Sequence, residues 1–188
     1  MKAAVIVFPG SNCDRDLATA FARAGAEVTM VWHKETALPA GVDLVGVPGG
    51  FSFGDYLRCG AIAARSAIMT EVVAEAGKGL PVLGICNGFQ VLVEAQLLPG
   101  GLIRNDHGRF ICRDQQLRVE RIDTPWTSRY LDDHIITVPL KNGEGGYIAD
   151  AETLDRLEGE GLIAFRYVGG NPNGSINDIA GVSNPRGN

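Results

Sequence analysis

The stretch that decides the fold is Pro81-Val-Leu-Gly-Ile-Cys-Asn-Gly-Phe-Gln90, in which an apolar run leads through a glycine-flanked cysteine into a helical pattern. It predicts a strand over residues 81–85 and a helix over 88–97. Glycines at 84 and 88 predict the tight turn that pushes a nucleophile out of a sheet, because a Cβ there would collide with its neighbours. A helix N-terminus also favours the thiolate form of a cysteine. We therefore interpret Cys86 as a catalytic nucleophile rather than a buried structural cysteine.

Composition sets the class of protein. The chain has 188 residues, of which 45% are hydrophobic and 21% charged, so it can build one domain with a sizeable core. Its formal charge is −5 with no basic run, which argues against nucleic acid as a partner, and no apolar run is long enough for a membrane span. The four cysteines show no C-x-x-C spacing, so the sequence predicts neither a metal site nor disulfides, but a reduced, cytoplasmic enzyme.

The first half of the chain alternates strands with helices. A continuous apolar run predicts a strand over residues 3–8, and further strands are predicted over 26–32 and 42–47. Helical patterns predict helices over 13–24 and 61–76. This order is typical of the α/β class, with an open, mostly parallel sheet flanked by helices, as in flavodoxin-like folds. Such sheets bind ligands at the carboxyl ends of their strands, where Cys86 and the segment 48–55 are expected.

The second half indicates antiparallel structure. Residues 109–113 and 117–122 alternate around Asp114-Gln-Gln116, which predicts a hairpin with its turn at these polar residues. Further strands are predicted over 135–138, 162–168 and 176–182, the last after a turn at Asn171-Pro-Asn-Gly174. We expect an antiparallel addition to the parallel core.

A glycine-rich segment, Val47-Pro-Gly-Gly-Phe-Ser-Phe-Gly-Asp55, follows the third predicted strand. It has neither the Gly-Lys-Ser/Thr of a phosphate loop nor the spacing of a dinucleotide-binding loop. A Gly-Gly pair at a strand end can instead direct backbone N–H groups at a developing oxyanion. Alone the segment would be an ordinary turn, but beside the cysteine turn it suggests an oxyanion site.

Four segments carry a family resemblance: residues 48–63, Gly84-Ile-Cys-Asn-Gly-Phe-Gln90, Gly143-Glu-Gly-Gly-Tyr147 and Asn171-Pro-Asn-Gly-Ser175. The chain resembles the PurQ family, the glutaminase subunits of phosphoribosylformylglycinamidine synthase, which are glutamine amidotransferases of the triad type that serve purine biosynthesis. The resemblance runs through the chain in order, so we expect a single glutamine amidotransferase domain over residues 1–188.

The resemblance implies a role for each matching residue. Cys86 would attack the side-chain amide of glutamine, forming a thioester and releasing ammonia. The oxyanion would be held by backbone N–H groups of Asn87 and of Gly50 or Phe51. Residues expected to contact the glutamine are Gln90, Asn105, Arg109 and Phe110. No cofactor is expected on this chain; the family implies a larger PurL-type synthetase subunit that uses ATP and magnesium, and a small PurS-type accessory subunit.

One family segment is absent. A His-Pro-Glu segment that supplies the base and its orienting carboxylate does not occur before Asn188. The three histidines, His33, His107 and His134, are better interpreted as surface or internally satisfied residues. The sequence therefore predicts a C-terminally incomplete domain that hydrolyses glutamine weakly or not at all by itself, because both a base and an acid are needed.

Three alternatives remain open at this point. The chain could be a glutaminase domain for another acceptor, a cysteine-based stress sensor or chaperone-like protein, or a non-catalytic regulatory subunit. The first is disfavoured by the segment 48–63, and the second has no need for Gln90 or for the Asn171–Ser175 turn.

Overall fold

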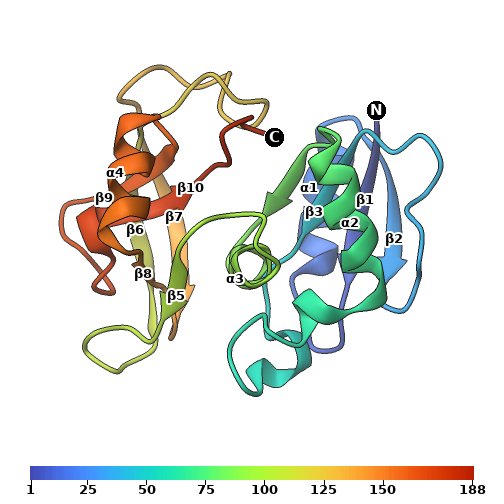
Figure 1. Ribbon diagram of the computed structural model, residues 1–188, viewed down its shortest axis with the longest axis horizontal. Coiled ribbons are helices and arrows are strands. Elements are labelled where there is room, and N and C mark those ends of the chain that lie inside the picture. The colour runs from blue at the N-terminus through green and yellow to red at the C-terminus, as the bar shows by residue number, and fades with distance from the viewer. The chain divides into compact units, whose positions relative to one another are not determined.

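Residues 1–188 are described by a computed structural model, and they divide into two units, Met1–Leu97 and Leu98–Asn188 (Figure 1). The first unit carries the α/β alternation, and the second carries the antiparallel strands. The expected single domain over the whole length stays a prediction.

A four-stranded parallel sheet forms the centre of the first unit. Its order is β2 (Glu27–Trp32), β1 (Lys2–Val7), β3 (Leu44–Val47) and β4 (Val82–Gly84), and each neighbouring pair is parallel. Residues 3–6 of β1 are apolar and buried, as expected for a strand covered on both faces. The predicted parallel core is confirmed.

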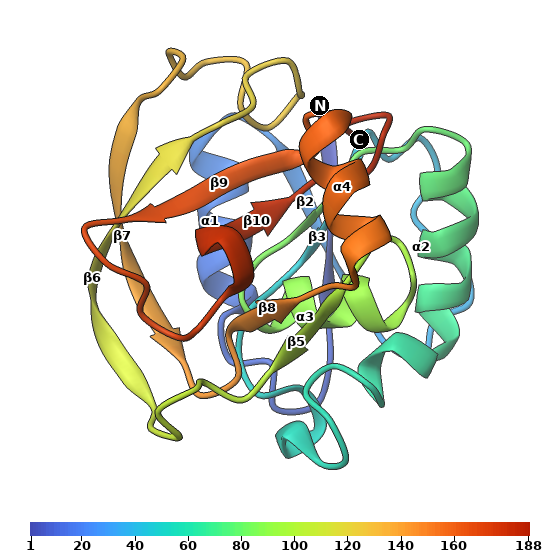
Figure 2. The ribbon, with the colours of Figure 1, turned by 60° about the vertical axis from the view of Figure 1, so that its left-hand side comes forward.

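Helices cover both faces of this sheet. Helix α1 (Asp14–Arg23) and helix α2 (Ala67–Gly77) lie on opposite sides of it (Figure 2). Helix α1 comes so close to β3 that a Cβ at Gly46 would lie 2.7 Å from side-chain atoms of both Leu17 and Phe21. A larger residue at position 46 would therefore require the side chains of Leu17 and Phe21 to shift.

The predicted helix over 61–76 starts later than expected. A 3₁₀ turn, η2 (Ala63–Arg65), comes first, and Ser66 then adopts an extended conformation with ψ 154° before α2 begins at Ala67. The Ser66 hydroxyl donates to the Ala63 carbonyl oxygen at 2.7 Å, which stabilises the break. A local side chain to backbone hydrogen bond thus competes with the helix.

Three loops meet at the carboxyl ends of the parallel strands. Because β2 lies on one side of β1 and β3 on the other, the strand order reverses at β1, the position at which such sheets bind ligands. Residues 8–13 follow β1, residues 48–55 follow β3 and include the 3₁₀ turn η1 (Ser52–Asp55), and Cys86 follows β4. The sheet thereby places the predicted nucleophile at its functional edge.

The second unit contains two antiparallel sheets. One has the order β10 (Ile179–Val182), β9 (Ile163–Val168), β6 (Ile111–Val119) and β7 (Ile135–Asn142). The other pairs β5 (Gly101–Ile103) with β8 (Gly146–Ile148). The expected antiparallel addition is confirmed, and its strands form sheets of their own.

The predicted hairpin over 109–122 is wrong. Strand β6 runs without a turn through Asp114-Gln-Gln116, and Gln115 lies opposite Val138 on β7. The Gln115 side chain is buried and donates from Nε2 to the Val168 carbonyl oxygen at 2.9 Å. A polar triplet that is typical of a turn is here a stretch of strand, because tertiary partners satisfy its one buried amide.

Helix α4 (Ala151–Gly159) was not predicted. The Asp150 side chain caps it by accepting from the Thr153 N–H at 2.8 Å, and Leu157 is buried. The last predicted strand is also shorter, because residues 176–178 form the 3₁₀ turn η3 (Ile176–Asp178), in which Asn177 has φ 51°. None of the helices combines the length and the apolar character that crossing a membrane requires.

Tyr147 provides a test of the packing in the second unit. It is fully buried, its hydroxyl donates to the Pro99 carbonyl oxygen at 2.7 Å, and burial raises its pKa to about 12. The folded state thus holds this proton more tightly than the unfolded state, so stability is lost as pH rises from about 10 toward 12. Tyr147→Phe should cost about 1 kcal/mol near pH 8 and flatten this alkaline loss.

Urea unfolding at a series of pH values measures both effects. The matched control is Tyr56→Phe: Tyr56 is 75% exposed, and the loss of its hydroxyl should change stability little. An alkaline loss in Tyr147→Phe as steep as in the unmodified protein would contradict the assignment.

Candidate active site

The backbone turns sharply at Cys86, as the sequence predicts. Cys86 has φ 56° and ψ −113°, a strained conformation for a residue with a side chain, and it directly precedes helix α3 (Asn87–Glu94). A Cβ at Gly88 would lie 1.9 Å from the Val47 carbonyl oxygen, and one at Gly84 would lie 2.7 Å from the Gly88 carbonyl oxygen. The predicted reason for the two glycines is confirmed.

The loop after β3 passes directly beside this turn. A Cβ at Gly49 would lie 3.2 Å from the Cβ of Cys86, so the two backbones nearly touch. Gly50 has φ 127°, and a Cβ there would lie 2.6 Å from the Asn12 nitrogen in the loop after β1. The Gly-Gly pair therefore lets three loops converge on one sulfur atom.

Two backbone N–H groups are directed at the Cys86 thiol, those of Asn87 and Gly50. Both were predicted as oxyanion donors. The third predicted donor, the N–H of Phe51, is bound instead to the Gly10 carbonyl oxygen at 3.1 Å. Of the predicted alternatives Gly50 and Phe51, the geometry favours Gly50.

The ionisation of the thiol differs from the sequence prediction. Burial raises the pKa of Cys86, and the nearby Cys13 and Asp55 raise it further, whereas hydrogen bonds from the N–H groups of Asn87 and Gly50 lower it. The net direction is upward: the N–H at the start of the helix favours thiolate as expected, but burial has the larger effect on the pKa. The residue is exposed, but enough protein surrounds the thiol for burial to be the largest effect.

The Asn87 carboxamide joins the loop to helix α3. It is almost fully buried, and its Oδ1 accepts from the Ser52 N–H at 3.1 Å. Its Nδ2 donates to Asp55 Oδ1 at 3.2 Å and to Gln90 Oε1 at 2.8 Å. Gln90, predicted to contact glutamine, thus lies one helical turn after Cys86 in contact with this network.

Residues 53–58, in the loop after β3, have a strained backbone and an exposed tip. Phe53, Asp55 and Leu57 all have positive φ, between 53° and 71°. Arg58 forms a two-point ion pair with Glu94 on α3, with Nε–Oε1 and Nη2–Oε2 distances of 2.7 and 2.6 Å. Tyr56 and Leu57 project outward and are 75% and 89% exposed. The loop is therefore held at its base and presents apolar side chains at its tip.

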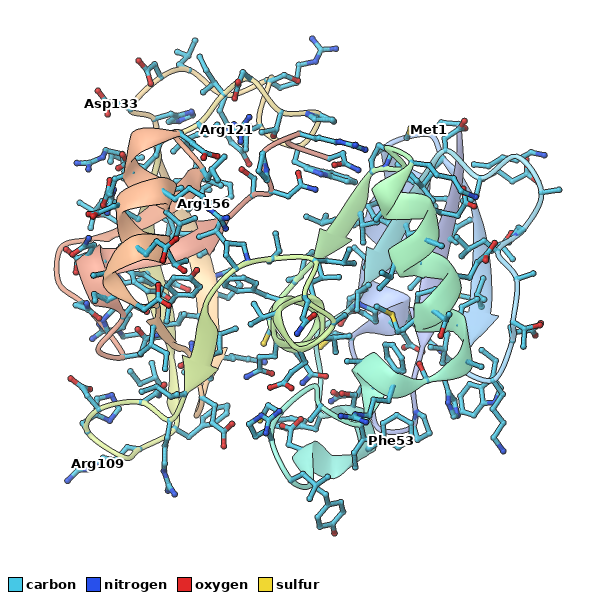
Figure 3. The ribbon with its side chains drawn as sticks, viewed as in Figure 1. Met1, Phe53, Arg109, Arg121, Asp133 and Arg156 are labelled. Atoms are coloured by element: carbon cyan, nitrogen blue, oxygen red, sulfur yellow. The ribbon has the colours of Figure 1, made fainter.

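The other predicted glutamine contacts lie in the second unit. Asn105 is buried, and its Nδ2 donates to the carbonyl oxygens of Arg109 and Asn142, while its Oδ1 accepts from the Gly145 N–H. Its side chain therefore organises a loop. Phe110 is exposed, and Arg109 projects from the tip of that loop, away from the rest of its unit (Figure 3).

Asn173 and Ser175 help to shape this region, a role that the sequence reasoning missed. Asn173 Nδ2 donates to the Gly145 carbonyl oxygen at 2.9 Å, and the Tyr147 N–H donates to Ser175 Oγ at 3.0 Å. Asn171 Oδ1 accepts from three successive N–H groups, those of residues 173–175. The Asn-Pro-Asn-Gly-Ser motif was the available signal: the sequence predicts a turn there and a family resemblance, but no role in shaping the loop around Gly145.

Each histidine has a local structural partner, as predicted. The His33 ring packs edge-on against Phe53, with centroids 5.2 Å apart. His107 interacts through Nε2 with the Pro172 carbonyl oxygen, and the His134 ring contacts Tyr130. No three side chains of the types that bind metal ions come together.

The close contact at Gly88 can be tested by mutation. Gly88→Ala should destabilise the protein by about 2 kcal/mol or more, because the new methyl group meets a backbone carbonyl that cannot rotate away. Gly77→Ala is the control: a Cβ there has nothing within 4 Å, and it lies at the end of helix α2, so stability should stay the same or rise. Urea unfolding gives both values, and equal stability of the two variants would contradict the packing described.

Comparisons with known proteins agree with this geometry. The family model for the CobB/CobQ-like glutamine amidotransferase domain matches residues 1–188. The PurQ subunit of phosphoribosylformylglycinamidine synthase from Leifsonia xyli subsp. xyli is 63% identical over 188 residues, which cover all of this chain and 81% of that protein. The corresponding subunit from Streptomyces coelicolor is 59% identical over 184 residues, covering 98% and 81%.

A solved structure gives the same result. A chain in the structure of PurLQS from Thermotoga maritima superposes with a TM-score of 0.89 at 41% identity, covering all of this chain and 83% of that one. A glutamine amidotransferase from the same organism is 18% identical with a TM-score of 0.54, which shows a shared fold. This chain therefore belongs to the glutamine amidotransferase family and, within it, to the PurQ glutaminase subunits of phosphoribosylformylglycinamidine synthase.

Proposed function

We propose that Cys86 hydrolyses glutamine through a thioester and that the ammonia released serves amidine synthesis in purine biosynthesis. The observation that carries this proposal is the convergence of the Gly50 and Asn87 N–H groups on a thiol held in a strained turn. Membership of the PurQ family supports the same chemistry.

The geometry supports a specific sequence of steps. The sulfur of Cys86 attacks the side-chain amide carbon of glutamine, and negative charge develops on the amide oxygen. The N–H groups of Gly50 and Asn87 would hold that oxygen. The nitrogen leaves as ammonia after it gains a proton, and water then cleaves the thioester to glutamate.

Attack requires that the thiol first lose its proton. Burial raises the pKa of Cys86, so few molecules carry a thiolate near neutral pH, and a base is needed. His33, His107 and His134 are engaged in the local contacts described above. That residues 1–188 alone hydrolyse glutamine weakly stays a prediction.

The glutamine contacts remain a proposal. We expect Gln90 to contact glutamine, and the resemblance implies the same for Arg109 and Phe110 of the second unit. Asn105 would act indirectly by holding the loop of residues 105–109, because its own amide is bound to backbone groups.

A synthetase subunit would receive the ammonia. A chain of the PurLQS structure is similar to this one. The name of that complex includes PurL and PurS, which supports a PurL-type synthetase and a small PurS-type subunit as partners of this chain. We propose that ATP and magnesium belong to the synthetase, that this chain holds no cofactor, and that the complex works in the cytoplasm. The exposed side chains of Tyr56 and Leu57 would dock on the partner.

The relatives found do not support the alternative functions. Identity of 63% to a PurQ subunit over the full chain favours purine biosynthesis over a glutaminase that serves another ammonia acceptor. It gives no support to a stress sensor or chaperone. A regulatory, non-catalytic subunit would have no need for a strained nucleophile with two N–H groups directed at it.

Cys86→Ser tests the nucleophile. In the complex with the synthetase, glutamine-dependent product formation should fall by about 10⁴-fold or more, because the hydroxyl is a far weaker nucleophile here. Synthesis with added ammonium salt should persist, since the synthetase step does not need the thiol. Cys112→Ser, an exposed cysteine in the second unit, is the control and should keep full activity. Full glutamine-dependent activity in Cys86→Ser would refute the proposal.

The docking surface can be tested separately. Replacing Tyr56 and Leu57 together by Ala should weaken binding to the synthetase about tenfold or more, measured by calorimetry or ultracentrifugation. These residues are better probes than Asp55 and Arg58, which bind Asn87 and Glu94 within the unit. The control is Leu131→Ala, 76% exposed in the second unit. Unchanged affinity in the double variant would place the docking surface elsewhere.

A further inference from the structure

An aromatic cluster lies at the carboxyl end of the parallel sheet. It consists of the rings of Phe8, Trp32, His33 and Phe53. The His33 ring contacts all three others: its centroid lies 4.5 Å from Trp32, 5.2 Å from Phe53 and 6.5 Å from Phe8. His33 is therefore the central member of the cluster.

His33 is itself held rigidly. Its N–H donates to the Val7 carbonyl oxygen at the end of β1, and its carbonyl oxygen accepts from the Ile68 N–H in helix α2. The residue is buried, with 9% of its surface exposed, and both burial and the neighbouring Lys34 lower the pKa of its imidazole. The ring is thus a neutral, fixed surface for Phe53.

Phe53 belongs to the loop that carries Gly50. It has φ 53°, a conformation that persists only where the surroundings impose it. Its N–H donates to the Pro9 carbonyl oxygen at 2.6 Å, and the Gly54 N–H turns back to the Phe51 carbonyl oxygen at 2.8 Å. The labelled Phe53 lies in the loop between β3 and α2 (Figure 3). Holding the Phe53 ring therefore holds the tight turn that follows Gly50.

We propose that His33 is a positioning residue, which packs on Phe53 and thereby keeps the Gly50 N–H directed at the sulfur of Cys86. It touches neither substrate nor sulfur in this role. The inference rests on the proposed role of Cys86, but its test measures the ionisation of the thiol and does not require glutamine hydrolysis. The inference can therefore fail while the proposed function holds, and the proposed function can fail while the inference holds.

The test measures the pKa of the Cys86 thiol. The full chain is alkylated with iodoacetamide at a series of pH values, and the rate at Cys86 is followed by peptide mass spectrometry. His33→Ala should raise this pKa by about one unit, which is about tenfold less thiolate at neutral pH, because the hydrogen bond from Gly50 is weakened. His33→Phe keeps an aromatic ring and should leave the pKa unchanged. His134→Ala, which removes a ring contact in the second unit, is the control.

The direction of the shift separates positioning from general loosening. If His33→Ala merely opened the site, burial of the thiol would decrease and its pKa would fall. A fall or no change in the Cys86 pKa of His33→Ala would overturn the proposal. So would a rise in His33→Phe equal to that in His33→Ala. Should His33→Ala fail to fold, Phe53→Ala removes the other side of the contact and should give the same rise. In the double variant the rise should be no larger than in either single one, since both act through one contact.

Discussion

The approach of the backbone at Gly88 to the Val47 carbonyl oxygen is the constraint on which the site depends. No side chain fits between the start of α3 and the end of β3, so the helix can begin directly against the strand. This closeness forces Cys86 into its strained conformation and places its side chain beside Gly49. Rigid elements rather than a mobile loop therefore set the position of the sulfur, which is what a reaction needing alignment within fractions of an ångström requires.

The same closeness limits the reactivity of the thiol. Packing three loops around one sulfur brings two N–H donors to it but also surrounds it with protein, and the second effect on its pKa is the larger. A thiol that is mostly protonated reacts slowly with stray electrophiles. It becomes an effective nucleophile when a base takes its proton in the presence of bound glutamine. The N–H groups of Gly50 and Asn87 would then stabilise the negative charge that develops on the substrate oxygen.

Local patterns in the sequence were sufficient for the parallel sheet and for the turn at Cys86. Runs rich in apolar residues predicted β1 to β4, and the spacing of Gly84 and Gly88 predicted the turn with its physical reason. The hairpin at Asp114–Gln116 was wrong, because the partner of the buried Gln115 lies on a distant strand. The raised pKa of Cys86 and the aromatic cluster around His33 likewise depend on residues far apart in the chain, which no local pattern records.

A structure of the protein covalently bound to a glutamine-like electrophile tests the central claim most directly. The account predicts a bond to the sulfur of Cys86, with the former amide oxygen about 2.7–3.1 Å from the backbone nitrogens of both Gly50 and Asn87. An adduct on another cysteine, or an oxygen directed away from these two nitrogens, would contradict it.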